Sequence, residues 1–265
     1  MIFQIKAYLQ FLLRSKNRHG VHSPFVYQFV ENCFNDRAPY EAYQTFADAN
    51  RQLAANKQLI CVTDHGAKSK TMHPKQRRVC DMAAVAGITP YRQQLLYRLA
   101  RYFNIENALE IGTSVGKATV ALAAANVRVQ TIEGCANTQA VAKDLLADYS
   151  DRIQFTNGTF EAILPTINDH KFDLIFFDGN HQYEPTISYF NTLLPTAHAK
   201  SVWIFDDIYY SANMQRAWEV IRNDARVTLS IDTFRWGMVF FEPRPHKEHF
   251  VIRPPFFFDR TQWGF

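Results

Sequence analysis

An acidic residue and two glycines form the most specific chemical pattern in the sequence. The stretch Ala108-Leu-Glu-Ile-Gly-Thr-Ser-Val-Gly-Lys-Ala-Thr119 places Glu110 at the end of an apolar run, and Gly112 and Gly116 in the turn that follows. Glycine permits the unusual backbone dihedrals and the close ligand approach that such a turn requires. A phosphate-binding turn would have the spacing G-x-G-x-x-G at a helix N-terminus. The spacing here is G-x-x-x-G behind a carboxylate, which repels phosphate and suits a cationic amino-acid group.

Further polar residues follow the next two apolar runs. Glu133 ends the run Val129-Gln-Thr-Ile-Glu, about 20 positions beyond the first glycine, where a carboxylate can accept both hydroxyls of a ribose. This residue alone would serve NAD equally well. Asn157 and Gly158 end the third run, where an adenine is expected, although Asn-Gly is also a common turn.

Carboxylates and a histidine follow the fourth and fifth apolar runs. Asp178 ends the fourth run, His181 lies in the loop after it, and Asp206 and Asp207 end the fifth. Because neighbouring parallel strands end at the same edge of a sheet, these carboxylates are expected to converge. Clustered carboxylates raise each other's pKa or share a cation. His181 is a candidate general base, a metal ligand or a hydrogen-bonded loop histidine, and the sequence leaves these alternatives open.

The elements that position these residues alternate in type. From about Pro90 onward, apolar runs of strand length alternate with helical patterns, which is typical of βαβ units and a parallel sheet. The predicted strands are 107–111, 128–132, 153–156, 172–177 and 201–205. The predicted helices are 117–125, 138–148, 160–167, 185–194 and 211–224.

The pattern changes after the fifth strand. Val227–Asp232 and Met238–Glu242 are two strands joined by a few residues, too few for a crossover helix, so they must be antiparallel. The fold class predicted is therefore α/β, a doubly wound, seven-stranded and mostly parallel sheet of Rossmann-like type. A dinucleotide-binding dehydrogenase would continue in parallel.

The first part of the chain, up to about Gly87, has the pattern of short helices joined by loops. Apolar residues recur at helical spacing near the start, so an amphipathic helix is expected, with one apolar face formed by Ile2, Ile5, Leu9 and Leu12.

The polar segment from Asn17 to Phe25 has two interpretations. It forms a lid that contacts ligand through Arg18, His19 and His22, or it is a loop that caps the next helix through Ser23 and Pro24.

Composition sets broader limits. With 47% hydrophobic and 20% charged residues, the chain is typical of a soluble globular protein. No apolar run approaches the roughly 18–20 residues that span a bilayer, and no signal-peptide pattern is present, so a cytoplasmic location without a membrane partner is expected. Four cysteines lie far apart and without a C-x-x-C pair, which argues against a disulfide framework or a zinc site; they are Cys33, Cys61, Cys80 and Cys135.

Charge is unevenly distributed. Residues 1–100 hold 14 Lys and Arg against 6 Asp and Glu, a balance of +8, whereas residues 101–265 hold 15 against 19, a balance of −4. A basic N-terminal part is compatible with nucleic-acid binding, and equally with a solvated surface. The aromatic tail from Phe250 to Phe265 is expected to pack on the body of the protein, with an exposed partner patch as the alternative.

These motifs together resemble class I S-adenosylmethionine-dependent methyltransferases. The resemblance rests on Glu110-Ile-Gly-Thr-x-x-Gly-x-x-Thr, Glu133, Asp178-Gly-Asn-His-x-Tyr183 and Phe205-Asp-Asp207, and it covers about residues 90–243. The motifs are similar to those of the branch that contains catechol- and caffeoyl-CoA-type O-methyltransferases and the bacterial methyltransferase domain 24 group. Ser114 replaces the middle glycine of the family's loop, as in the O-methyltransferase-like variants.

The resemblance implies a set of functional residues. S-Adenosylmethionine would be the cofactor, with its methionine ammonium at Glu110. In catechol-type relatives an Asp and an Asp-Asn pair hold a divalent metal, which implies Mg or Ca, although Asp207 stands where Asn is expected. The implied cofactor-binding residues are Glu110, Gly112, Thr113, Ser114, Gly116, Glu133, Asn157, Gly158 and Asp178; the implied catalytic residues are His181 and Asp178, and the implied metal ligands are Asp178, Asp206 and Asp207.

The resulting prediction is methyl transfer from S-adenosylmethionine to an oxygen or nitrogen of a small molecule. Residues 1–89 would be a helical extension or lid, 90–245 the cofactor-binding core and 246–265 a tail packed on it. A nucleic-acid methyltransferase is an alternative, although the Asn/Asp-Pro-Pro-Tyr/Phe motif of many base methyltransferases is absent after the fourth strand. A non-catalytic cofactor-binding scaffold is another, and a homodimer stays open.

Overall fold

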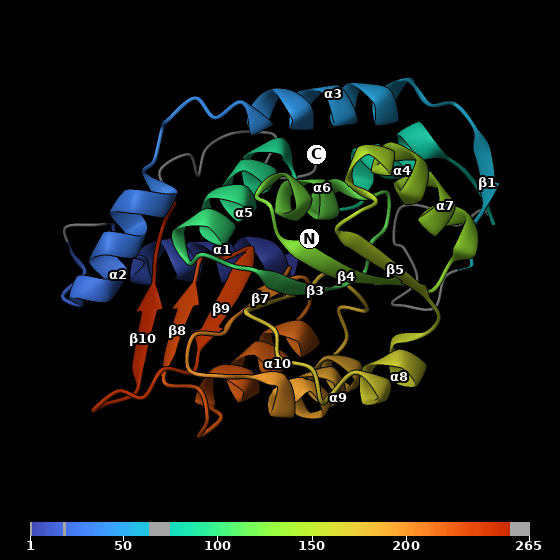
Figure 1. Cartoon of the computed structure of the whole chain (residues 1–265). Helices are drawn as coiled ribbons and strands as arrows, with labels where there is room; N and C mark the ends of the chain where they lie inside the picture. Colours follow the sequence, from blue (N-terminus) through green and yellow to red (C-terminus); the bar gives the residue numbers. More distant parts are fainter. Residues whose placement is uncertain (1, 18–19, 64–74, 255–265) are drawn as a thin grey trace. The chain divides into compact units, whose positions relative to one another are not determined.

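The computed structural model describes residues 2–17, 20–63 and 75–254, drawn in colour in Figure 1. The chain forms two compact units. Of the described residues, those up to 36 and those from 164 to 254 belong to the first unit, and those between 37 and 163 belong to the second. Among the described residues, no helix is both long and apolar enough to cross a membrane.

The second unit holds three parallel strands with helices around them. Strand β4 pairs with β3 on one side and with β5 on the other. Its strands are β1 (Leu59–Cys61), β2 (Gln76–Arg78), β3 (Asn107–Ile111), β4 (Arg128–Glu133) and β5 (Ile153–Asn157). Its helices are α3 (Ala42–Ala55), α4 (Val79–Val85), α5 (Pro90–Tyr102), α6 (Lys117–Ala124), α7 (Ala136–Leu145), η3 (Ala147–Tyr149) and α8 (Phe160–Ile163). The predicted strands and helices of this region are confirmed, with small shifts at their ends.

A short antiparallel hairpin, β1 with β2, interrupts the helices of the N-terminal part. Its Ile60 is buried, whereas Leu59 and Cys61 on either side are exposed, as strand alternation requires. This hairpin was not predicted from the sequence. It lies in the segment assigned to a helical extension, so that extension also contains strands.

The first unit completes the fold with a mixed sheet. Strands β6 and β7 are parallel, β9 is antiparallel to both β7 and β8, and β10 is parallel to β8. Strands β10, β8 and β9 lie side by side in Figure 1. Its strands are β6 (Leu174–Phe177), β7 (Val202–Asp206), β8 (Leu229–Asp232), β9 (Trp236–Phe240) and β10 (Glu248–Val251). Its helices are α1 (Ile2–Arg14), α2 (Pro24–Phe29), η2 (Val30–Phe34), η4 (Leu164–Thr166), α9 (Tyr183–Leu193), η5 (Leu194–Thr196) and α10 (Ala212–Asn223).

The antiparallel strand pair that closes the predicted sheet is confirmed by β8 and β9. All seven predicted strands of the sheet are present, and β10 is an additional one in the segment predicted to be a packed tail. The part of that tail from residue 255 onward lies outside the described residues. The fold is thus the predicted α/β, mostly parallel, Rossmann-like type.

The close approach of α10 to β9 in the first unit explains why residue 237 is a glycine. A Cβ atom on Gly237 of β9 would lie 2.6 Å from the ring of Trp218, which is buried on α10. Real Cβ atoms do not approach an aromatic ring so closely, so glycine is what allows α10 to pack against this strand.

Helix α1 is present where it was predicted, but most of its predicted apolar face points to solvent. Ile2, Ile5 and Leu9 are exposed. The buried residues are instead Ala7 and Phe11. The helix has apolar residues on opposite sides, so periodicity alone could not decide which side the protein covers.

Candidate active site

The turn after β3 has the backbone that its glycines predict. Gly112, Ser114 and Gly116 all have positive φ, at 105°, 49° and 87°. The first and last of these suit glycine, and Ser114 lies in the left-handed region that only a few non-glycine residues occupy. The N–H groups of Gly112 and Thr113 donate to the carbonyl oxygen of Ile132, which fixes the turn against β4.

Glu110 lies fully buried at the end of β3, and the two oxygens of its carboxylate differ in their hydrogen bonding. Oε2 accepts hydrogen bonds of 2.6 Å from the hydroxyls of Thr119 and Thr131. Oε1 is buried and has no hydrogen-bond partner in the part of the chain that the structure describes. Burial, opposed by the two threonines, raises the pKa of this carboxyl from 4.5 to about 7. A buried acid with an unpaired oxygen is expected to have a cationic or donor partner.

The threonines that hold Glu110 were not predicted from the sequence. Thr119 is in the first turn of α6, and Thr131 is a buried residue two positions before Glu133 on β4. Thr131 also lies 2.6 Å, oxygen to oxygen, from Thr113 in the turn. Threonines in apolar surroundings beside an acid at a strand end were the available signal, because a buried hydroxyl needs a partner.

Glu133 is anchored by two backbone N–H groups. Its Oε2 accepts from Ser114 and its Oε1 accepts from Cys135, each at 2.9 Å. These two bonds hold the carboxylate of Glu133 in a fixed orientation beside the turn. The structure therefore joins the glycine turn to Glu133, as expected from the sequence.

Asn157 and Gly158 lie next to Glu133 as well. The side chain of Asn157 donates to the carbonyl oxygen of Glu133 at 2.8 Å, and the N–H of Gly158 donates to the same oxygen at 3.1 Å. The ends of β3, β4 and β5 thus bring the predicted cofactor-binding residues of the second unit together.

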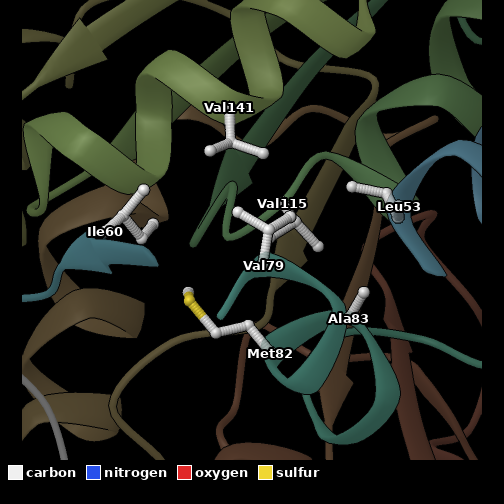
Figure 2. Close-up of a cluster of buried hydrophobic side chains, with 7 residues drawn as sticks. All are labelled: Leu53, Ile60, Val79, Met82, Ala83, Val115 and Val141. Carbon is white, nitrogen blue, oxygen red and sulfur yellow. The ribbon is translucent and has the colours of Figure 1, made fainter. Parts of the chain in front are cut away.

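A hydrophobic cluster supports the turn (Figure 2). Val115 of the turn and Val141 of α7 pack with buried side chains of α3, β1 and α4, which are Leu53, Ile60, Val79, Met82 and Ala83. Gly116 is part of the same packing, because a Cβ there would lie 3.0 Å from Leu146 Cδ1. The N-terminal segments of this unit therefore fix the position of the turn.

In the first unit, Asp178 and His181 form a pair. His181 Nε2 lies 3.7 Å from Asp178 Oδ1, and both side chains are only partly exposed. The imidazole ring also lies 5.8 Å from the ring of Tyr210, centroid to centroid. Burial and the nearby Asp207 raise the pKa of the Tyr210 phenol. An acid beside an imidazole can orient the ring and stabilise its protonated form.

The other two carboxylates are arranged differently. Asp206, at the end of β7, is buried, whereas Asp207 has a φ of 51° and pairs with Arg235 at 3.1 Å. Among the described residues, no group of three or more His, Cys, Asp or Glu side chains could hold a metal ion. Asp178, Asp206 and Asp207 do not form such a group here, and the implied metal site at these residues stays a prediction.

The lid interpretation of the segment before α2 stays a prediction. Ser23 occupies the N-cap position and Pro24 the first turn of α2, without a side-chain capping bond. His22 is exposed. Arg18 and His19 lie outside the described residues.

Comparison with family models matches part of this core. Residues 109–208 match the family model Methyltransf_24, described as a methyltransferase domain. No curated protein matches the sequence.

Three similar solved structures show the same fold. An O-methyltransferase from Bacillus cereus in complex with SAH is 20% identical, with a TM-score of 0.53 over 81% of this chain and 96% of that one. The SAH-bound Podospora anserina methyltransferase PaMTH1 is 15% identical, with a TM-score of 0.57 over 84% and 98%. The O-methyltransferase TomG from Streptomyces achromogenes, in complex with SAM, is 21% identical, with a TM-score of 0.54 over 78% and 92%.

The Rossmann-like sheet and the acidic glycine turn define the methyltransferase class of α/β proteins. The match over residues 109–208 identifies this stretch as a methyltransferase domain, and the similar structures share the fold of this chain.

Proposed function

We propose that this enzyme methylates an oxygen atom of a small molecule. The observation that supports S-adenosylmethionine as the cofactor is Oε1 of the buried Glu110, which has no hydrogen-bond partner among the described residues. The choice of oxygen and of a small acceptor is supported by the similar folds of enzymes described as O-methyltransferases. Nitrogen is the alternative acceptor atom.

The second unit has the groups that this cofactor requires. Glu110 would pair with the methionine ammonium through Oε1, while Thr119 and Thr131 hold its other oxygen. Glu133, fixed by two N–H groups, would accept the ribose hydroxyls. Bound S-adenosylmethionine supplies a sulfonium methyl group. Asn157 and Gly158 would lie along the adenine.

Asp178 and His181 would act on the acceptor. As the new oxygen–carbon bond forms and the sulfur–carbon bond breaks, the acceptor hydroxyl must lose its proton. His181 would take that proton, and Asp178, 3.7 Å away, would stabilise the resulting imidazolium.

The experiment is methyl transfer from radiolabelled S-adenosylmethionine to a panel of catechols, phenols and hydroxylated acids, with total RNA as a second panel. His181→Gln and Asp178→Asn should lower transfer by roughly 100-fold or more, the range of general acid–base catalysis. His181→Gln should leave the affinity for S-adenosylhomocysteine nearly unchanged. Exposed His170 provides the matched control, since His170→Gln should retain full activity.

The same experiment separates the alternatives. Labelled RNA with no labelled small molecule would favour a nucleic-acid methyltransferase, for which the basic N-terminal residues are the supporting observation. Cofactor binding with no transfer to either panel, and full retention of binding in the His181 variant, would favour a non-catalytic scaffold. Equal transfer by wild type and the His181 variant would remove that residue from the mechanism.

A further inference from the structure

Two arginines of the first unit form no salt bridge with another described residue. They are Arg14, the last residue of α1, and Arg222, in the last turn of α10. Three other arginines of this unit, Arg226, Arg235 and Arg244, each pair with a carboxylate. Because a guanidinium stays charged at any physiological pH, the first two bring positive charge that no ion pair balances within the described part of the chain.

The imidazole of His249, on β10, is close to both of these arginines. Its Nε2 lies 2.5 Å from Arg222 Nη1, and its Nδ1 lies 2.9 Å from the hydroxyl oxygen of Ser230 on β8. Since a guanidinium can only donate, Nε2 is the accepting nitrogen and the ring is neutral. Partial burial, together with the charges of Arg222 and Arg14, lowers the pKa of His249 to about 4. The two arginines therefore act on the same side chain.

Asp232, at the end of β8, balances only part of this charge. Its Oδ2 accepts from the Tyr209 hydroxyl at 2.6 Å, and its Oδ1 accepts from the N–H of Phe234 at 2.8 Å. Burial raises the pKa of Asp232, opposed by these two hydrogen bonds and by the charges of Arg14 and Arg222. Both oxygens accept, as in a carboxylate. Two positive charges and one negative charge leave a balance of +1 while the imidazole is neutral.

We propose that Arg14, Arg222 and His249 bind a phosphate group, either as inorganic phosphate or as part of a small phosphorylated molecule. Guanidinium groups match the geometry of phosphate oxygens and can donate to two of them at once. The Nε of Arg222 is buried and has no hydrogen-bond partner among the described residues, so this donor requires an acceptor. The three side chains are distinct from the proposed cofactor and proton-transfer residues, so the proposal does not depend on methyl transfer.

Binding should place a proton on His249. A phosphate dianion has one negative charge more than the cluster can balance with a neutral imidazole. When the anion replaces Nε2 as the acceptor for Arg222, Nε2 can take up a proton and donate to the anion in turn. Because the complex then holds a proton that the ligand-free protein lacks, the affinity for a dianion should rise as the pH falls.

Calorimetric titration of the full chain with sulfate tests the proposal, because sulfate stays a dianion between pH 6 and pH 8. We expect binding to one site, tighter at pH 6 than at pH 8. Arg222→Gln should weaken it by roughly 10-fold or more, through the loss of charge-assisted hydrogen bonds. Arg226→Gln is the matched control, since it removes an exposed arginine that already pairs with Asp224, and it should bind like wild type.

The proton uptake has its own measurement. His249→Gln should bind sulfate with an affinity that no longer depends on pH, because a glutamine amide donates to the anion without titrating. In wild type, an NMR titration of the His249 ring should give a higher pKa with saturating sulfate than without it. Equal affinities for inorganic phosphate and glycerol 3-phosphate would assign the site to the free anion, and tighter binding of the ester would assign it to a phosphorylated molecule.

Three results would overturn the proposal. Sulfate and inorganic phosphate could both fail to saturate the protein below about 50 mM, Arg222→Gln could bind as well as wild type, or acetate could bind as tightly as sulfate. Arg222→Lys is a second variant that keeps the charge but not the planar donor group, and wild-type affinity in it would contradict recognition by the guanidinium. Urea unfolding should show that each variant is folded under the titration conditions.

Discussion

Replacing Glu110 with Gln should remove a specific pH dependence from the stability of the cofactor-free enzyme. The folded-state pKa of Glu110 is raised from 4.5 to about 7 by complete burial. Between these two values, the folded protein holds a proton at Glu110 that the unfolded chain has lost. Stability therefore falls as the pH rises from about 4.5 to about 7, and by pH 8 the loss amounts to about 3 kcal/mol.

Gln at this position keeps the shape and an oxygen for the two threonine hydroxyls, but it carries no charge. At pH 5 the variant and wild type should have similar free energies of unfolding, and at pH 8 the variant should be more stable by up to about 3 kcal/mol. Urea unfolding of both proteins, at half-unit steps from pH 5 to pH 8, measures the difference directly. Taking the difference removes the contribution of other titrating groups, which both proteins share.

Glu110→Gln should also weaken the binding of S-adenosylhomocysteine. S-Adenosylhomocysteine carries the same ammonium group, so its affinity for wild type should improve about tenfold for each unit that the pH rises toward 7, and then level off. The Glu110→Gln variant should bind weakly at every pH, because the ammonium would lose its carboxylate. If the free energies of unfolding of the two proteins stay parallel from pH 5 to pH 8, the assignment of a raised pKa to Glu110 is refuted.

Three further substitutions test the packing that supports the site and its surroundings, each followed by urea unfolding. Gly116→Ala should destabilise by about 1–3 kcal/mol, because φ is 87° and the new methyl group meets α7; an unchanged midpoint would contradict the tight packing. Gly237→Ala should destabilise at least as much, because its Cβ would lie 2.6 Å from the Trp218 ring; Trp218→Leu in the same chain should relieve part of the loss. Tyr209→Phe should cost about 1–3 kcal/mol, because it removes the 2.6 Å hydrogen bond to the buried Asp232, and no loss would show that another donor replaces it.

The sequence predicted the parts of the fold that depend on local pattern. The positions of Glu110, before a G-x-x-x-G turn, and of Glu133, at the end of the next apolar run, could be predicted. A strand end and a glycine turn fix where the neighbouring side chains lie. The closing antiparallel pair followed from the shortness of its connection. In these cases spacing along the chain determines the geometry.

Other features depend on residues far apart in the chain. Nothing near Asp207 in the sequence indicates that Arg235 pairs with it. The direction of α1 depends on Phe234, which packs on only one of its two apolar sides. Strand β10 mixes polar and apolar residues, and it becomes a strand because it pairs with β8.

Calorimetric titration of the wild-type enzyme with S-adenosylhomocysteine, with NAD as the comparison ligand, decides whether the acidic glycine turn and Glu133 form the cofactor site. We expect one-site binding of S-adenosylhomocysteine that is largely lost in Glu133→Ala, and no detectable binding of NAD. Binding of NAD without binding of S-adenosylhomocysteine, or an unchanged affinity in the Glu133 variant, would contradict this assignment.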